Sequence, residues 1–362
     1  MSSAETLVVT TPQEEEEVLF AMEQAMIASV PLVLKAAMEL GILELLSESS
    51  AQLSPAQIAS RLSIKSPDAT VTLDRILRFL ASYSFLSCTL AQDKAGRPER
   101  LYGLGPKSKF LVNGQGHNIA PWVLFLLDKV SLSGWFHLKE AVVKGEGDPF
   151  KLANGAILYE YTGTDPELNN SFNNAMKCGS TYYMGKIMEF YRGFEGARTV
   201  VDVGGGVGES LRLILSKHPH LRGINFDLPY VVKDGVSYPG LEHVAGSFVD
   251  DPIPKGDVLL VKWQFHGFGD EFSLQLLKNC WSALPASGKV VIIDPISPEY
   301  PGTDLVTRTT FTSDMIMLGM TNGGKDRTLK ELEIMARAAG FGALKVACRI
   351  HNMWVLELYK TA

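Results

Sequence analysis

The sequence has 362 residues, of which 46% are hydrophobic and 20% charged, so it can form two domains of ordinary globular composition. A net charge of −6 without clustered Lys and Arg argues against a nucleic-acid-binding protein. The four cysteines lack metal-ligand spacing, the N-terminus is acidic, and no apolar run reaches the ~20 residues that span a bilayer, so we expect a cytoplasmic protein with no membrane contact.

Helical patterns dominate the first 86 residues. Thr11-Pro12-Gln13-Glu14 combines a hydroxyl cap, an early proline and first-turn carboxylates, which predicts a helix start. Helical spacing continues to about Leu46, with a kink expected at Pro31. Two further helices and a strand are predicted over 54–62, 71–86 and 102–112. Three helices and a hairpin would make a winged-helix-like unit over residues 1–116. We expect it to serve packing or dimerisation, because its presumed recognition helix carries few cations.

The remainder, residues 117–362, is predicted as a second domain. Residues 117–195 are helical and rich in aromatics and methionines, which is typical of a core or of an apolar pocket wall. Short β-branched runs then alternate with helices, as a doubly wound, Rossmann-like parallel sheet requires. The expected strands are 199–204, 224–229, 243–247, 257–263 and 289–294, closed by a hairpin of 343–350 and 353–360.

A glycine-rich turn, VVDVGGGVGES, follows the first expected strand of this sheet. Gly204, Gly206 and Gly208 allow a tight turn and close approach by a ligand. A dinucleotide fingerprint would need glycine where Glu209 stands, which disfavours a nicotinamide dehydrogenase. The observed spacing, Asp202-x-Gly204-x-Gly206-x-Gly208, instead suits S-adenosylmethionine. Its ribose hydroxyls can bind Asp227 at the end of the next strand.

Several long motifs resemble the plant caffeic acid-type O-methyltransferases, a homodimeric and metal-independent class. They include GFEGARTVVDVGGGVG, INFDLPYVV, YPGLEHVAGSF, VKWQFHGFGDE and NGGKDRTLKELEIMARAAGF, and the likeness runs from about residue 16 to 360. The resemblance implies methyl transfer from S-adenosylmethionine to a small aromatic acceptor, leaving S-adenosylhomocysteine. Gly204, Asp227 and Lys262 match cofactor-contacting positions of the family, and Ser247 and Phe248 are expected on the adenine side of the cofactor. Ser247 replaces an acidic residue of the family.

His266, just past the strand VLLVKW, is expected to be the general base. A phenol has a pKa near ~10, so a neutral imidazole that takes its proton makes the oxygen nucleophilic. Two carboxylates that would orient His266, Asp294 and Asp326, stand where the family has glutamates, and Gly267 replaces an aspartate. Aspartate is one methylene shorter, so we expect altered geometry around the base.

The resemblance also predicts an acceptor pocket. Its wall is expected to contain Leu126, Ser131, Leu158, Thr162, Leu168, Phe172, Met176, Trp263, Ile316, Met317 and Thr321. Thr162, Gly179 and Thr321 replace polar groups that serve the propenoic tail in the family, and no Arg or Lys is among the wall positions. An uncharged phenylpropene, monolignol or larger aromatic is therefore favoured over an acid.

Three alternatives remain open at this point. The acceptor could be an aromatic amine or a side-chain alcohol of a monolignol, and the altered surroundings of His266 fit N-methylation as well as O-methylation. The protein could also be a catalytically silent binding partner that keeps the cofactor pocket. Asp250 and Asp251 are interpreted as a strand-end loop before Pro252 and not as a metal site.

Overall fold

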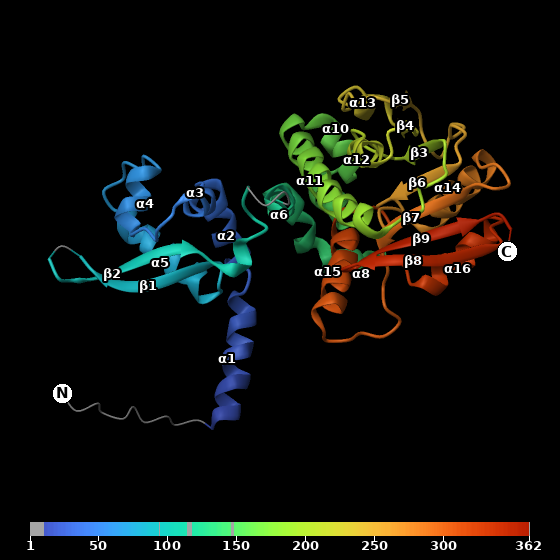
Figure 1. Cartoon of the computed structure of the whole chain (residues 1–362). Coiled ribbons are helices and arrows are strands. Elements are labelled where there is room, and N and C mark those ends of the chain that lie inside the picture. Colours follow the sequence, from blue (N-terminus) through green and yellow to red (C-terminus); the bar gives the residue numbers. More distant parts are fainter. Residues whose placement is uncertain (1–10, 94, 114–117, 146–147, 362) are drawn as a thin grey trace. The chain divides into compact units, whose positions relative to one another are not determined.

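The structure is a computed structural model that describes residues 11–93, 95–113, 118–145 and 148–361 (Figure 1). The chain divides into two compact units, Met1–Val123 and Leu124–Ala362. The domain boundary expected between residues 116 and 117 lies outside the described residues. Each unit is taken by itself below.

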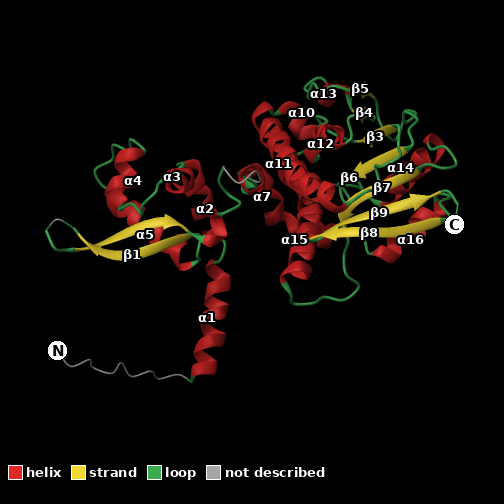
Figure 2. Ribbon diagram, viewed as in Figure 1, coloured by secondary structure: helices red, strands yellow, loops and turns green. Residues whose placement is uncertain are grey.

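Unit 1 combines helices with a two-stranded antiparallel hairpin, as the sequence predicts (Figure 2). Thr11 caps the first helix by accepting a hydrogen bond from the Glu14 amide at 3.2 Å. Ser54 begins another helix with a capping box to Gln57. The elements are α1 Pro12–Met26, α2 Ser29–Glu39, α3 Ile42–Glu48, α4 Pro55–Arg61, α5 Ala69–Ser82, β1 Leu86–Gln92, β2 Pro98–Leu104 and the 3-10 helix η1 Pro106–Ser108.

Two details of the expected unit 1 are wrong. The bend after α1, of 49°, falls before Ser29. Pro31 lies in the first turn of α2, where a backbone amide would have no intrahelical acceptor, so the proline removes no helical hydrogen bond. The expected strand over 102–112 is instead β2, which ends at Leu104. At Gly105 an added Cβ would lie 2.6 Å from the Phe85 carbonyl carbon, so the chain packs tightly here and turns into η1.

No single helix among the described residues is long and apolar enough to cross a membrane. The bent pair α1 and α2 meets the length and composition limits only when the two helices are taken together.

Unit 2 contains a seven-stranded sheet in the order β5-β4-β3-β6-β7-β9-β8, which confirms the doubly wound prediction (Figure 1). The first five strands in this order are parallel, and β9 runs antiparallel to both β7 and β8. The strands are β3 Thr199–Val203, β4 Arg222–Asp227, β5 Leu241–Ala245, β6 Val258–Lys262, β7 Lys289–Pro295, β8 Ala343–Ile350 and β9 Met353–Tyr359.

Helices cover both faces of this sheet. Alternate residues of β3 point to opposite sides: Val201 packs in a core with α14 and α16, and Val200 packs in a second core with α11 and α12. The helices of unit 2 and the helix that leads into it are α6 Ala120–Leu126, α7 Lys129–Ser133, η2 Gly134–His137, α8 Leu138–Lys144, α9 Pro149–Asn154, α10 Leu158–Thr164, α11 Pro166–Phe190, α12 Glu209–Lys217, α13 Pro229–Val232, α14 Asp270–Ala283, α15 Leu305–Met320 and α16 Leu329–Ala338.

Candidate active site

Four neighbouring parallel strands end at one edge of the sheet. In the order β4-β3-β6-β7 they terminate near Asp227, Gly204, Lys262 and Asp294. Ligands of open α/β sheets bind at this carboxyl edge, where the strand order reverses beside β3. The structure therefore brings together predicted cofactor residues and a predicted positioning residue of the base.

The glycine turn adopts the conformation that its sequence indicates. Gly204, Gly206 and Gly208 have φ angles of 72°, 61° and 89°, a region that favours glycine. A Cβ on Gly204 would lie 2.5 Å from the Gln264 side-chain nitrogen, whereas a Cβ on Gly206 would meet nothing within 4 Å. The turn thus packs against the loop that follows β6 and leaves open space at Gly206.

Asp202, in β3 before this turn, is a site residue that sequence reasoning used only as a spacing marker. Its side chain is 1% exposed, and neither carboxylate oxygen has a hydrogen-bond partner among the described residues. Burial raises its pKa, the Lys262 charge opposes that shift, and Asp227 adds to it. A buried acid after two valines is the signal that could have identified it.

Asp227 lies at the end of β4 and holds the glycine turn. Its two oxygens accept hydrogen bonds from the amides of Gly206 and Leu228, each at 2.7 Å. Burial raises the pKa of Asp227, although both amide bonds act in the opposite direction. Each oxygen keeps a second lone pair, so the carboxylate can still accept ribose hydroxyls as predicted.

Ser247 and Phe248 follow β5 and differ in their surroundings. The Ser247 hydroxyl donates to Asp250 at 2.8 Å and accepts from the Asp250 amide at 3.2 Å, which supports the loop interpretation of that acidic pair. Phe248 is 9% exposed and makes edge contacts with Phe268 and Phe272. Within the described residues, no cluster of His, Cys, Asp and Glu suits a metal ion.

Lys262 and Trp263 lie at the end of β6. Lys262 Nζ donates to the Ser180 hydroxyl at 2.9 Å and lies 3.6 Å from the centre of the Trp263 ring. Burial lowers the pKa of Lys262, and the charges of Asp202 and Asp294 oppose the shift. Trp263 has φ of 59°, which is rare for a bulky residue and marks local strain beside the site.

His266 follows in the same loop and contacts a carboxylate from a distant segment. Its Nδ1 lies 3.3 Å from Asp326 Oδ1, and its Nε2 makes no hydrogen bond to a described residue. Burial would lower the pKa of His266, but the Asp326 bond and the charges of Asp294 and Asp326 outweigh it, so the pKa is raised. The Nδ1 contact leaves Nε2 for a ligand.

Asp294, at the end of β7, lies behind this loop. Its Oδ2 accepts a long hydrogen bond of 3.3 Å from the Phe265 amide, while its Oδ1 has no partner among the described residues. Burial raises the pKa of Asp294 to about 7, the His266 charge opposes the shift, and Asp326 adds to it. The two expected carboxylates thus act on His266 in different ways, one by contact and one by charge.

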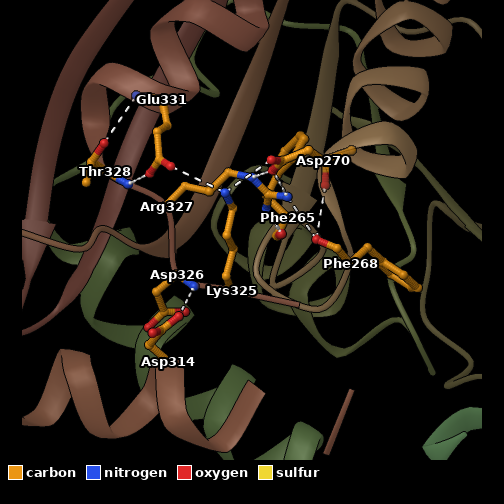
Figure 3. Close-up of polar contacts among 10 residues, drawn as sticks. Phe265, Phe268, Asp270, Asp314, Lys325, Asp326, Arg327, Thr328 and Glu331 are labelled. Atoms are coloured by element: carbon orange, nitrogen blue, oxygen red, sulfur yellow. Dashed lines mark hydrogen bonds and ion pairs between the residues drawn. The ribbon is translucent and has the colours of Figure 1, made fainter. Parts of the chain in front are cut away.

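A buried arginine joins the two segments that carry the base and its carboxylate (Figure 3). We call residues 265–270 the base loop and residues 321–328 the support segment. Arg327 Nε and NH2 donate to Asp270 Oδ1 and the Phe268 carbonyl, each at 2.9 Å, and NH1 donates to the Phe265 carbonyl. Because Arg327 follows Asp326 directly, this residue fixes the base loop beside the carboxylate that contacts His266.

The support segment packs against the base loop without room for a side chain at Gly324. A Cβ on that residue would lie 2.6 Å from the His266 carbonyl oxygen and would collide with the Thr321 hydroxyl. Asp314 on α15 accepts a hydrogen bond from the Asp326 amide at 2.8 Å, so the helix also anchors the segment (Figure 3). The predicted wall residue Thr321 is therefore close to the base.

Apart from Trp263, the other predicted wall residues are distributed over five helices. Leu168, Phe172 and Met176 occur at intervals of four on α11 and so share one face. Phe172 has edge contacts with Phe125 and with Tyr159 of α10, a residue absent from the predicted wall. The remaining positions are Leu126 on α6, buried Ser131 on α7, buried Leu158 and Thr162 on α10, and Ile316 and Met317 on α15.

Comparisons with known proteins agree on one family. The O-methyltransferase domain family matches residues 135–342, and the O-methyltransferase dimerisation domain family matches residues 22–114. Caffeic acid 3-O-methyltransferase 1 of Ocimum basilicum is 48% identical over 99% of this chain and 100% of the relative. Caffeic acid 3-O-methyltransferase of Prunus dulcis is 49% identical over 99% of each.

Solved structures show the same fold. Human N-acetylserotonin methyltransferase in complex with SAM has a TM-score of 0.83 at 19% identity, covering 98% of this chain and 100% of its own, and this likeness shows the fold alone. CalO1, a methyltransferase of calicheamicin biosynthesis in its SAH bound form, has a TM-score of 0.79 at 25% identity, with the same coverage.

Proposed function

The chain belongs to the O-methyltransferase family, and from that premise we propose that it methylates a phenolic hydroxyl of an uncharged phenylpropanoid, with His266 as general base. The chain is an enzyme, and its methyl donor is S-adenosylmethionine. Its relatives named for caffeic acid support the phenylpropanoid class of acceptor.

The residues at the sheet edge fit the donor. Open space at Gly206 admits a ligand against the turn, and the unpartnered carboxylate of Asp202 attracts hydrogen-bond donors and positive charge. Asp227 would accept the ribose hydroxyls, and Ser247, Phe248 and Lys262 would border the remainder of the cofactor. When bound, S-adenosylmethionine supplies a methyl group on a positively charged sulfur, which needs no further activation.

The chemical task left to the protein is to place the acceptor and remove its proton. We assign His266 Nε2 as the atom that takes the phenolic proton, because Nδ1 faces Asp326 at 3.3 Å. Asp326 fixes the ring orientation, and both Asp326 and Asp294 stabilise the imidazolium that forms. This contact between His266 and Asp326 is the observation that carries the proposal.

The charged side chains of the site favour an acceptor without a carboxylate. Lys262 is engaged with Ser180 and Trp263, and Arg327 with the base loop. No Arg or Lys is among the predicted wall positions, so a carboxylate at the end of the acceptor away from the phenol would have no cation there to pair with. We therefore propose a monolignol, phenylpropene or related neutral aromatic.

A panel of acceptors tests this assignment. Purified enzyme is incubated with labelled S-adenosylmethionine and phenylpropanoid alcohols, the matching acids, aromatic amines and O-methylated controls that lack a free phenol. We expect label in the phenolic ether of the alcohols, with a higher kcat/KM than for the acids. Label only on nitrogen or on a side-chain alcohol would replace the phenol assignment, and no transfer to any acceptor would indicate a silent binding protein.

We further propose that the enzyme is a homodimer. The dimerisation domain family covers residues 22–114, and α1 exposes a row of apolar side chains that a second copy could cover. These are Val18, Leu19, Phe20, Met22 and Met26. The cytoplasmic location expected from the sequence stays a prediction, which imaging of a fluorescent fusion in plant cells would check.

A further inference from the structure

Tyr159 on α10 lies among the rings that border the base loop. Its ring stacks on Phe268 with centroids 5.6 Å apart and an interplanar angle of 22°, and Phe268 in turn stacks on Phe272. The Tyr159 ring also makes an edge contact with Phe172 at 6.2 Å. These contacts join the ring to the base loop and to α11, which carries the predicted wall residues Leu168, Phe172 and Met176.

Although its ring is held by these contacts, the hydroxyl of Tyr159 has no hydrogen-bond partner among the described residues. Its oxygen is also not completely enclosed by protein atoms. The oxygen therefore faces accessible space, in a region otherwise built from aromatic rings. Tyr159 is half-buried, so its hydroxyl can donate to a ligand that enters this space.

Gly267, the residue after the base, makes room for this hydroxyl. A Cβ on Gly267 would lie 3.1 Å from the Tyr159 oxygen, closer than ordinary van der Waals contact allows. The Gly267 backbone does not adopt the left-handed region, so its conformation alone does not require glycine. The absence of a side chain is thus matched to the position of the tyrosine.

The hydroxyl is a neutral donor at physiological pH. Burial, together with the charges of Asp227, Tyr230 and Asp294, raises the pKa of Tyr159 to about 12. A hydroxyl that stays protonated can donate to an ether or hydroxyl oxygen of a ligand.

We propose that Tyr159 is a specificity-determining residue that donates a hydrogen bond to an oxygen substituent beside the reacting hydroxyl of the acceptor. The inference rests on the proposed function, because it takes Phe172 as part of the acceptor wall and His266 as the base. The ring of Tyr159 touches that wall, and its oxygen reaches the residue next to the base. The contact therefore belongs to the end of the acceptor where methyl transfer occurs.

Two acceptors that differ by one oxygen test the proposal. They are 3,4-dihydroxycinnamyl alcohol and 4-hydroxycinnamyl alcohol, and their binding to the S-adenosylhomocysteine complex is measured by calorimetry. We expect Tyr159→Phe to weaken binding of the dihydroxy compound roughly fivefold to tenfold and to change binding of the monohydroxy compound by less than about twofold. The matched control Tyr161→Phe removes a hydroxyl two residues away on the same helix, and should alter neither affinity.

A second variant tests the same contact from the other side. Gly267→Ala places a methyl group against the tyrosine oxygen and should reduce the preference for the dihydroxy compound. The double variant of Tyr159→Phe with Gly267→Ala should lose no more affinity for that compound than Tyr159→Phe alone, because both substitutions act on one interaction.

The outcomes separate the inference from its premise. Equal losses for both acceptors in Tyr159→Phe, or no loss for either, would overturn the specificity role while leaving methyl transfer intact. If the wild-type enzyme binds neither phenol, the proposed function itself fails, and the inference fails with it.

Discussion

The pair of His266 and Asp326 combines a base with the group that orients it. The imidazole is largely buried, which by itself would favour its neutral form, yet the neighbouring carboxylates raise its pKa above the ordinary 6.5. A base with a raised pKa binds a proton more strongly, but a larger fraction of it is already protonated near neutral pH. The enzyme should therefore lose activity as the medium becomes acidic, at a pH above 6.5.

Replacing Asp326 by asparagine should move this acid limb. The amide keeps an oxygen near Nδ1 but removes the negative charge, so the pKa of His266 falls and the acid limb of kcat/KM shifts to lower pH. We also expect kcat to fall by roughly 10–100-fold, by analogy with other groups that orient a ligating histidine. The measurement is a pH profile of kcat/KM on a neutral phenol.

Asp314→Asn is the matched control for that profile. Asp314 accepts a hydrogen bond from the Asp326 amide, and the side-chain oxygen of an asparagine can accept the same bond. Asp314 is not among the groups that shift the pKa of His266. The acid limb of kcat/KM in Asp314→Asn should therefore stay at the pH of the wild-type enzyme. An unmoved limb in Asp326→Asn would contradict the role of Asp326 as the charged partner of the base.

At the scale of elements, the site depends on two loops that are far apart in sequence. The base loop lies between β6 and α14 and ends at the first residue of α14, and the support segment connects α15 to α16. Arg327 is enclosed between them, with its side chain 1% exposed, and donates to carbonyls that would otherwise lack a charged donor. Its position explains how a loop end can hold a base rigidly.

Arg327→Gln should therefore affect both stability and turnover. Loss of the buried guanidinium leaves the Phe265 and Phe268 carbonyls without their donor, and we expect the free energy of unfolding to fall by about 2–4 kcal/mol. Displacement of the base loop should lower kcat more than it raises KM. Chemical denaturation and steady-state kinetics at a temperature where the variant is folded give both quantities.

Lys325→Gln is the comparison for Arg327. Lys325 also bridges Asp270, and it pairs with Glu331, but its side chain is 39% exposed and both partners are more exposed still. Its removal should cost no more than about 1 kcal/mol. Equal destabilisation by the two variants would argue against a special role for the buried arginine.

The sequence predicts strands better than it predicts these loop contacts. Short apolar runs rich in β-branched residues place the ends of β3 to β9 within about two residues of those in the structure. The signal is strong because the parallel strands are buried on both faces. By contrast, Tyr159 gave no signal, since its role depends on the neighbouring Gly267 across a long sequence separation. Asp202 entered the sequence analysis only through its spacing to the glycines, and its burial without a hydrogen-bond partner among the described residues became visible only in the structure.

At the scale of the whole molecule, unit 2 carries the candidate active site, and unit 1 exposes apolar side chains on α1. The described site residues all belong to unit 2, whereas α1 of unit 1 exposes Phe20 by 63% and Met26 by 58%. The hydrophobic pattern of α1 predicted a helix, but pattern alone could not tell whether its apolar side faces its own core or another copy.

Phe20→Glu should disrupt the proposed homodimer. A charge on a surface that a second copy covers is costly to bury, so we expect a monomer of about half the mass by light scattering, with secondary structure retained. Glu16→Gln on the same helix serves as the control and should remain dimeric. A wild-type protein that is monomeric at micromolar concentration would contradict the assembly proposed here.

The rate of methyl transfer by His266→Ala tests the central claim most directly. With saturating S-adenosylmethionine and a neutral phenol, kcat should fall by roughly 10²–10⁴-fold, the usual contribution of a general base. The dissociation constant of the cofactor should stay within about threefold, since His266 forms its hydrogen bond with Asp326 and not with the glycine turn. Turnover close to that of the wild-type enzyme would contradict the assignment of His266 as the base.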